Sequence, residues 1–174
     1  MKKIILSLVL SGIFISVNAQ TEKGDWMVGG RVDLNAAEDA THIGFSPGAA
    51  VFVAHNFAVG GNLVLDYNKS GDTKITSFGI GPLFRYYFTN AMVKPLIQVA
   101  VNYVSVKVSG PGFSATNDAA SFFIGGGAAV FINQNVALEP ILGYTNTDGN
   151  GGFSFGLGFQ VYLSKGQVDK VRGK

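Results

Sequence analysis

The chain contains no cysteine, few charged residues and only one tryptophan. Without cysteine, neither disulfides nor thiolate metal sites can form. Charged residues make up 14% of the sequence, against about 25% in ordinary soluble domains. The formal net charge of +2 is too small to indicate nucleic-acid binding. Beyond the N-terminal segment, no apolar run in the sequence approaches the roughly 20 residues of a membrane helix.

Residues 1–19 have the features of a secretory signal peptide. Lys2 and Lys3 give a positive start, residues 4–17 are mainly apolar, and Ala19 ends a motif of small residues. An uncleaved membrane anchor would need a longer apolar run, of roughly 20 residues. We therefore expect cleavage between Ala19 and Gln20.

Glycine and aromatic residues are abundant, and large apolar residues alternate with small or polar ones from Trp26 to Leu163. A period of two predicts β-strands with different surroundings on their two faces. The last stretch shows the alternation most clearly. One face carries Phe153, Phe155, Leu157, Phe159, Val161 and Leu163, and the other carries Gly152, Ser154, Gly156, Gly158, Gln160 and Tyr162. Bulky hydrocarbon opposite small or polar residues indicates a β-barrel whose outside faces lipid.

Turn residues divide the mature chain into eight such runs of about a dozen residues, enough for tilted strands, which need roughly 9–11 residues to span a bilayer. Short turns at His55, Thr89 and Asn133 alternate with longer loops near Glu38, Ser70, Gly112 and Gly149, of which residues 109–118 are the longest. Outer-membrane barrels have short periplasmic turns and longer external loops. We predict an eight-stranded antiparallel up-and-down transmembrane β-barrel over residues 20–163, with both termini on the periplasmic side.

Two parts of the chain depart from this pattern. Pro47, Pro82 and Pro95 fall inside strands, where proline removes a hydrogen-bond donor, so we expect bulges or strand ends there. Residues 164–174 lose the alternation and carry four basic residues. We expect them to form a short, disordered periplasmic tail.

A soluble barrel of the lipocalin type would place the bulky residues inside and the small ones outside. Its surface would then be rich in glycine and poor in charge, while its interior would have to hold two or three large rings from nearly every strand. An eight-stranded barrel has no room for so many rings. The alternation therefore favours lipid on the outside, and aromatic residues at the strand ends are typical of the two membrane interfaces.

Two sequence segments resemble a known family. Residues 78–88 (FGIGPLFRYYF) and 94–99 (KPLIQV) are similar to the small bacterial outer-membrane β-barrels, a family that includes OmpX and the transmembrane domain of OmpA. The resemblance covers residues 24–163 and implies an eight-stranded barrel in the outer membrane. It also extends to the family's assembly signal near the chain end, at Gly158, Val161 and Leu163, although eleven residues follow here.

Six charged residues occupy inward-facing positions of the alternation, three of each sign. Charges in a narrow lumen must be paired, so we predict a structural network of Arg31, Asp33, Asp66, Arg85, Lys94 and Glu139. A gate or a proton path is the alternative. Arg85 and Glu139 lie about four residues above their neighbouring turns, so we expect them to meet, with Arg31 as the competing partner.

Four aromatic residues occupy inward-facing positions of the alternation, two or three residues before the predicted periplasmic ends of alternate strands: Phe52, Tyr87, Phe131 and Tyr162. Side chains from alternate strands at similar depth form packed layers in small barrels. We predict that these rings close the periplasmic end of the lumen.

Other chemistry is weakly supported. His42 and Ser46 share one strand face, but no carboxylate is obviously placed to orient the histidine for catalysis. Glu38, Asp118 and Asp148 lack the spacing of a calcium loop, and residues 125–127 (GGG) lie within a strand rather than before a helix, unlike a phosphate-binding loop.

The sequence therefore predicts a monomeric, non-enzymatic outer-membrane protein without a cofactor, which serves envelope integrity, surface interaction or adhesion. Its expected partners are outer-membrane lipid, the assembly machinery and a surface partner that the sequence does not identify. A small channel or transporter is the main alternative, and a lipid-modifying enzyme is a weaker one.

Overall fold

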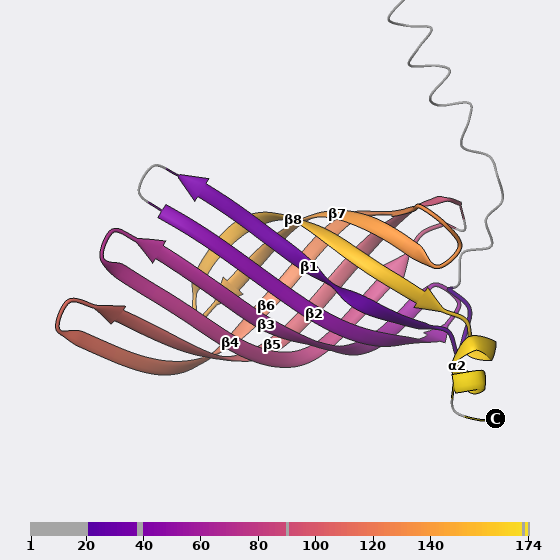
Figure 1. The fold of residues 1–174 in the computed structure, drawn as a ribbon, viewed down its shortest axis with the longest axis horizontal. Coiled ribbons are helices and arrows are strands. Elements are labelled where there is room, and N and C mark those ends of the chain that lie inside the picture. The colour runs from indigo at the N-terminus through magenta and orange to yellow at the C-terminus, as the bar shows by residue number, and fades with distance from the viewer. Residues whose placement is uncertain (1–20, 38–39, 90, 172, 174) are drawn as a thin grey trace, which may run out of the picture.

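The computed structural model describes residues 21–37, 40–89, 91–171 and 173, so the predicted signal peptide lies outside the described residues. Eight strands are followed by one short helix (Figure 1). The elements are β1 (Trp26–Ala37), β2 (Ala40–Ala54), β3 (Phe57–Ser70), β4 (Thr73–Tyr87), β5 (Val93–Gly110), β6 (Phe113–Phe131), β7 (Val136–Thr147), β8 (Asn150–Leu163) and α2 (Lys165–Val171). No helix within the described ranges is long and apolar enough to cross a membrane.

The strands form a closed barrel in which each strand pairs antiparallel with its neighbours in sequence. The barrel closes where β1 pairs with β8, from Trp26 opposite Leu163 to Asp33 opposite Gly156. The predicted eight-stranded antiparallel barrel is therefore confirmed. We call the end with the β1–β2, β3–β4, β5–β6 and β7–β8 connections the hairpin end. The opposite end, where β1 starts and α2 lies, is the terminal end (Figure 1).

The two faces of the barrel wall follow the predicted alternation. Along β8, Phe153 is 80% exposed and faces outward, whereas Gly156 and Gly158 are buried. On the inner face of β4, a Cβ added at Gly81 would overlap the backbone carbonyl oxygen of Val101. Glycine thus lets the wall pack closely on the inside, while the large apolar side chains cover the outside.

The connections at the hairpin end are not the long loops that the polar sequence suggested. Two-residue turns at 71–72, 111–112 and 148–149 join the strands there. Asp148 and Gly149 both have positive φ, 49° and 84°, as a type I′ hairpin turn requires. The connection near Glu38 falls on residues that the structure does not describe.

The predicted loop over residues 109–118 is therefore wrong, since β5 runs to Gly110 and β6 starts at Phe113. The predicted alternation of short turns with long loops is wrong for the same reason. At the terminal end the connections are residues 55–56, 88–92 and 132–135. A strand that extends beyond an apolar layer needs no apolar face, so its polar sequence resembles a loop.

The strand prolines are accommodated without bulges. Pairing between β2 and β3 is interrupted at Ser46 and Pro47, but the register is the same before and after the interruption. Pairing between β4 and β5 is interrupted in the same way at Gly81 and Pro82. Pro47 and Pro82 therefore each leave a local gap in one ladder, and the expected bulges do not occur there. Pro95 is the third residue of β5 and thus lies near a strand end, as expected.

The expected disordered tail contains a helix instead. Ser164 and Gln167 form a capping box before α2: the Gln167 backbone N–H donates to Ser164 Oγ at 3.3 Å, and the Ser164 N–H donates to Gln167 Oε1 at 2.8 Å. The Lys165 N–H also donates to Asp25 Oδ1 at 2.9 Å. The helix is thus capped and tied to the segment that precedes β1.

Candidate functional site

The lumen contains all ten residues that the sequence assigned to its interior, and the structure separates them by depth. Four rings lie near the terminal end. One charged pair lies directly above them, which here means toward the hairpin end, and one lysine lies below them. The other three charged residues lie toward the hairpin end, beside a cavity. The six charges therefore form separate groups along the barrel rather than one network.

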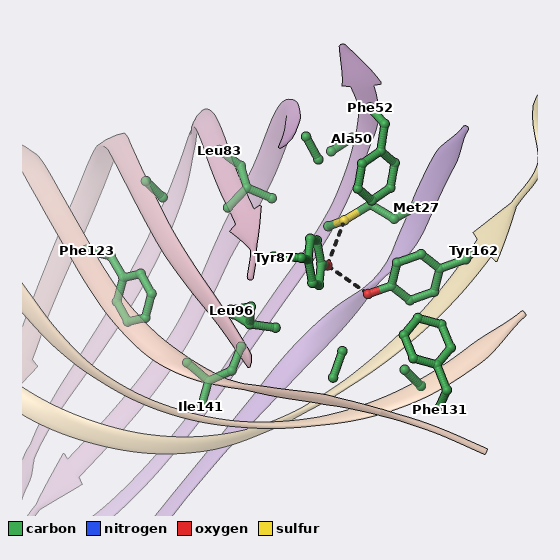
Figure 2. Close-up of a cluster of buried hydrophobic side chains, with 14 residues drawn as sticks. Met27, Ala50, Phe52, Leu83, Tyr87, Leu96, Phe123, Phe131, Ile141 and Tyr162 are labelled. Atoms are coloured by element: carbon green, nitrogen blue, oxygen red, sulfur yellow. Dashed lines mark hydrogen bonds between the residues drawn. The ribbon is translucent and has the colours of Figure 1, made fainter. Parts of the chain in front are cut away.

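The aromatic layer comprises Phe52, Tyr87, Phe131 and Tyr162, each at most 3% exposed. Figure 2 shows these rings gathered beside Met27, with Phe123 set apart from them. Tyr162 is central, because its ring centroid lies 4.8 Å from that of Phe131, 6.3 Å from that of Phe52 and 6.3 Å from that of Tyr87. Such separations are typical of packed aromatic pairs, so the four alternate strands contribute one contiguous layer.

A buried ion pair lies against this layer. Arg85 Nη1 donates to Glu139 Oε2 at 2.6 Å, and the two side chains are 3% and 0% exposed. The other carboxylate oxygen, Oε1, accepts a hydrogen bond from the Tyr162 hydroxyl at 2.6 Å. Both carboxylate oxygens are thus hydrogen-bonded, as a buried charge requires.

The same network connects the arginine to its neighbours. Arg85 Nη1 also donates to the Tyr87 hydroxyl at 3.1 Å, and its Nε donates to Gln98 Oε1 at 3.1 Å. The hydroxyls of Tyr87 and Tyr162 are 2.7 Å apart. The Tyr87 hydroxyl also contacts Met27 Sδ at 3.6 Å (Figure 2). The ion pair, Tyr87 and Tyr162 therefore form one hydrogen-bonded unit.

Below the rings, the segment before β1 closes the terminal end. Lys94 Nζ donates to Thr21 Oγ1 at 2.8 Å and lies 5.7 Å from the centroid of the Phe131 ring. The Thr21 hydroxyl donates to Asn56 Oδ1 at 2.7 Å. The sequence analysis missed Thr21 because this residue precedes the first strand. Outside a strand, no alternation of apolar and polar residues indicates which side chains point inward.

Toward the hairpin end, Arg31 pairs with Asp33 rather than with Glu139. Arg31 Nε donates to Asp33 Oδ2 at 2.8 Å, and the guanidinium carbon lies 4.3 Å from the centroid of the Phe123 ring. Phe123 is 5% exposed and was not among the predicted site residues. Its inward parity in β6 could have identified it.

A cavity of about 500 Å³ occupies the lumen above the aromatic layer. None of the four rings lines it, and its deepest walls include Met27, Arg85 and Gln160. At the hairpin end its lining includes the exposed residues Asn150 and Gly152. The cavity is therefore a blind pocket that opens only toward the hairpin end.

His42 and Ser46 both line this cavity, and a carboxylate does lie near the histidine, contrary to expectation. His42 Nε2 is 3.7 Å from Asp66 Oδ1, a contact that depends on the register between β2 and β3. However, residues four apart on one strand are separated by about 13 Å. His42 is therefore too far from the Ser46 hydroxyl to activate it as a nucleophile.

Metal chemistry has no evident centre in this lumen. Among the described residues, no group of three or more histidine, aspartate or glutamate side chains is arranged to hold a metal ion. The arrangement closes the lumen at the terminal end and leaves a polar cavity toward the hairpin end.

Comparison with known structures places this architecture among small outer-membrane barrels. The N-terminal β-barrel domain of OprF from Pseudomonas aeruginosa matches with a TM-score of 0.61 at 12% identity, covering 81% of this chain and 98% of that domain. Ail, the attachment invasion locus protein of Yersinia pestis, matches with a TM-score of 0.56 at 13% identity over 81% of this chain and 99% of Ail. Neisserial surface protein A matches with a TM-score of 0.52 at 17% identity over 80% of this chain and 97% of that protein.

No family model and no curated protein matches the sequence. At these identities, the structural matches establish the fold alone. The chain has the fold of the small eight-stranded outer-membrane barrels, as the resemblance in residues 78–99 implied.

Proposed function

We propose that this chain is a non-enzymatic integral outer-membrane protein whose barrel does not conduct and whose hairpin end serves surface interaction. One observation carries the proposal. The barrel wall is apolar on the outside, whereas β3–β6 continue beyond this wall as a polar sheet. In Figure 1 the β3–β4 and β5–β6 hairpins reach well past the β7–β8 hairpin.

The distribution of charge on the outer face supports a membrane around the barrel wall. Within the described strands, the outward charged residues are Lys69, Lys74, Lys107 and Asp118, and all lie beyond Tyr67 and Tyr103. A charged residue at the bilayer centre would cost about 2–4 kcal/mol. The apolar band below these tyrosines therefore suits hydrocarbon, with the tyrosines at its edge.

Two of the lysines also fit a membrane surface at the hairpin end. Lys69 and Lys74 lie directly opposite each other on β3 and β4, and both are exposed. Like charges opposite one another destabilise a strand pair, unless anions lie between or beside them. Lipid phosphates at a membrane surface would supply those anions. We assign the hairpin end, whose strands reach farther beyond the apolar band, to the outside, because the longer external segments of outer-membrane barrels lie there. Both termini then lie in the periplasm.

The extended sheet offers a surface for protein contact. From Phe113 to Ala119, the described ladders of β6 pair it only with β5, since pairing with β7 starts at Ser121. An unpaired strand edge can accept a strand from another protein. Meanwhile, the aromatic layer and the Arg85–Glu139 pair argue against a channel, and the separation of His42 from Ser46 argues against a hydrolase.

Orientation can be tested by cysteine labelling, because the chain has no cysteine of its own. We expect a membrane-impermeant maleimide to label Asn117→Cys in intact cells and to label Ser164→Cys only after the outer membrane is opened. The reverse pattern would contradict the orientation. Both variants should retain heat-modifiable migration in gel electrophoresis, which reports the folded barrel.

The role of the extension can be tested in a strain that lacks the protein. We expect the full chain to restore cell adhesion, and a variant with residues 106–117 replaced by a two-residue turn to insert normally without restoring it. If the shortened variant restores adhesion as well as the full chain does, the extended sheet is not the interaction surface. Detergent sensitivity of the same strains separates adhesion from envelope integrity.

A further inference from the structure

The alternation of the barrel wall inverts where β5 passes Tyr103. On the outward side of β5, the apolar residues end at Tyr103 and Ser105 follows. On the inward side, polar Asn102 gives way to Val106 and Val108. The extended sheet is therefore polar only on its outer face, and its inner face is apolar. An antiparallel sheet in water has this pattern when its apolar face covers another element.

The apolar side chains of the inner face are contiguous across three strands. Ile75 of β4 lies opposite Val108 of β5, and Val108 lies opposite Ala115 of β6. Side chains in such directly opposite positions are about 5 Å apart and pack together. A Cβ added at Gly110 would overlap the ring of Phe113, so this ring lies over the end of β5. We call Ile75, Val106, Val108, Phe113 and Ala115 the inner patch.

The inner patch is accessible from the hairpin end. Phe113 is 52% exposed, Ala115 is exposed, and the other three residues are partly exposed. In the described ladders, β6 pairs with β7 only from Ser121 onward, so β7 does not continue beside Phe113 and Ala115. The β5–β6 hairpin reaches well past the β7–β8 hairpin (Figure 1). A contiguous exposed apolar patch usually marks an interaction site.

The position of the inner patch excludes two occupants. Val106 lines the lumen cavity, so the inner patch faces the barrel axis, whereas the outer face of the same strands carries Lys74 and Lys107. The acyl chains around the barrel therefore do not reach the inner patch. Two copies in one membrane cannot bring their inner patches together either, because each inner patch faces the axis of its own barrel. A segment of another protein remains.

The shape of the inner patch limits that segment. Three neighbouring strands span about 10 Å, and the inner side of a closed barrel is concave. An α-helix with its side chains is about 10–12 Å in diameter, so it fits such a strip, whereas a flat sheet would touch it only at the edges. Residues 104–110 extend for about 20 Å, the length of a helix of about 14 residues.

We propose that the inner patch binds an amphipathic α-helix of a partner protein. The apolar stripe of the helix packs on Ile75, Val106 and Val108, the ring of Phe113 covers its outer end, and its polar face remains in water. The inference rests on the proposed function, because it names the part of the hairpin end that makes the surface contact. It also differs from strand addition at the free edge of β6, since it needs the inner face rather than the edge.

The direct test uses the full chain, which has no cysteine of its own, refolded in detergent micelles. An environment-sensitive fluorophore is attached at Ala115→Cys on the inner face. Thr116→Cys, the next residue and also exposed, is the matched control on the outer face. The probe is a peptide of about 14 residues with leucine at every third or fourth position. We expect it to shift the emission at position 115 to the blue in a saturable manner and to leave position 116 unchanged. A scrambled peptide controls for partition into the micelle.

Two double variants locate the contact. Val106→Thr/Val108→Thr keeps the shape of both side chains but places hydroxyls in the contact, and it should raise the Kd of the helical peptide by about tenfold. Ser105→Thr/Ser109→Thr makes the matching change on the outer face and should leave the Kd unchanged. Heat-modifiable migration verifies that each variant is folded.

Three results would overturn the proposal. The first is no response at position 115, or an equal response at position 116. The second is a response to an extended peptide of alternating valine and lysine but not to the helical one, which would indicate strand addition at β6. The third is an unchanged Kd in folded Val106→Thr/Val108→Thr.

Cell adhesion separates this proposal from the proposed function. If the variant with residues 106–117 replaced loses adhesion while Val106→Thr/Val108→Thr restores it fully, surface interaction stands and the inner patch is not its site. If the shortened variant also restores adhesion, the proposed function fails, and the fluorescence at position 115 still decides whether the inner patch binds a helix.

Discussion

The two ends of the lumen are built on the same strands and differ in almost every physical respect. At the terminal end, four rings pack in one layer and the Arg85–Glu139 pair is fully hydrogen-bonded. At the hairpin end, a cavity of about 500 Å³ lies between polar and charged side chains. Parity decides only that a side chain points inward. Side-chain size and hydrogen-bond pairing decide whether the lumen is closed or open at a given depth.

The largest expected effect comes from breaking the paired end. Glu139→Leu leaves the Arg85 guanidinium buried without its carboxylate, which should lower the free energy of unfolding by about 3–5 kcal/mol. Urea unfolding of the refolded barrel measures it. The double variant Arg85→Met/Glu139→Leu should recover part of the loss, and a double-mutant cycle without coupling would show that the two side chains act independently.

Opening the aromatic layer should have the next largest effect. Phe131→Ala removes the ring that packs 4.8 Å from Tyr162 and should cost about 3 kcal/mol. The combined variant Phe52→Ala/Phe131→Ala should also raise the conductance in planar bilayers, because it removes two of the four rings that separate the cavity from the terminal end. The unmutated barrel should show little steady conductance. Large, stable single-channel currents from it would mean that the rings do not seal the lumen.

A smaller effect is expected for the cap beneath the rings. Thr21→Val keeps the shape of the side chain but removes its hydrogen bonds with Lys94 and Asn56. The loss should be about 1–2 kcal/mol in the same urea unfolding assay. Thr89→Val at the exposed Thr89 is the matched control and should change stability by less than about 0.5 kcal/mol. Equal losses from both variants would show that the cap contributes no stability of its own.

The smallest effect is expected at the open end. Asp33→Leu removes the partner of Arg31, but this guanidinium lies beside a polar cavity and stacks on Phe123. The two side chains are 14% and 7% exposed, but the remaining contacts of Arg31 limit the penalty, so we expect a loss of about 1 kcal/mol. Comparison with Glu139→Leu measures the difference between the two ends directly. Losses of similar size would contradict the contrast between a sealed end and an open one.

The sequence was sufficient for features that depend on alternation. Inward or outward parity follows from a period of two, so the barrel and its lipid-facing pattern could be predicted before any pairing was known. The depth of Arg85 and Glu139 could be estimated by counting residues from the turns at Thr89 and Asn135. These inferences need only the position of a residue within its own strand.

Features that depend on register or on solvent could not be predicted in the same way. His42 approaches Asp66 only because of how β2 pairs with β3. The polar hairpin at residues 109–118 resembled a loop because no apolar layer contacts it. The capping box at Ser164 and Gln167 was visible in the sequence, and attention to helix-start signals would have identified α2.

The seam between β1 and β8 has a consequence for how the barrel forms and opens. Its ladder runs only from Trp26 to Asp33, whereas the β5–β6 ladder runs from Val93 to Gly110. It also joins the first strand to the last, so it cannot form until the whole chain is present, and such distant contacts slow folding. In the finished barrel this short ladder should be the first to exchange its amide hydrogens, starting at Asp33.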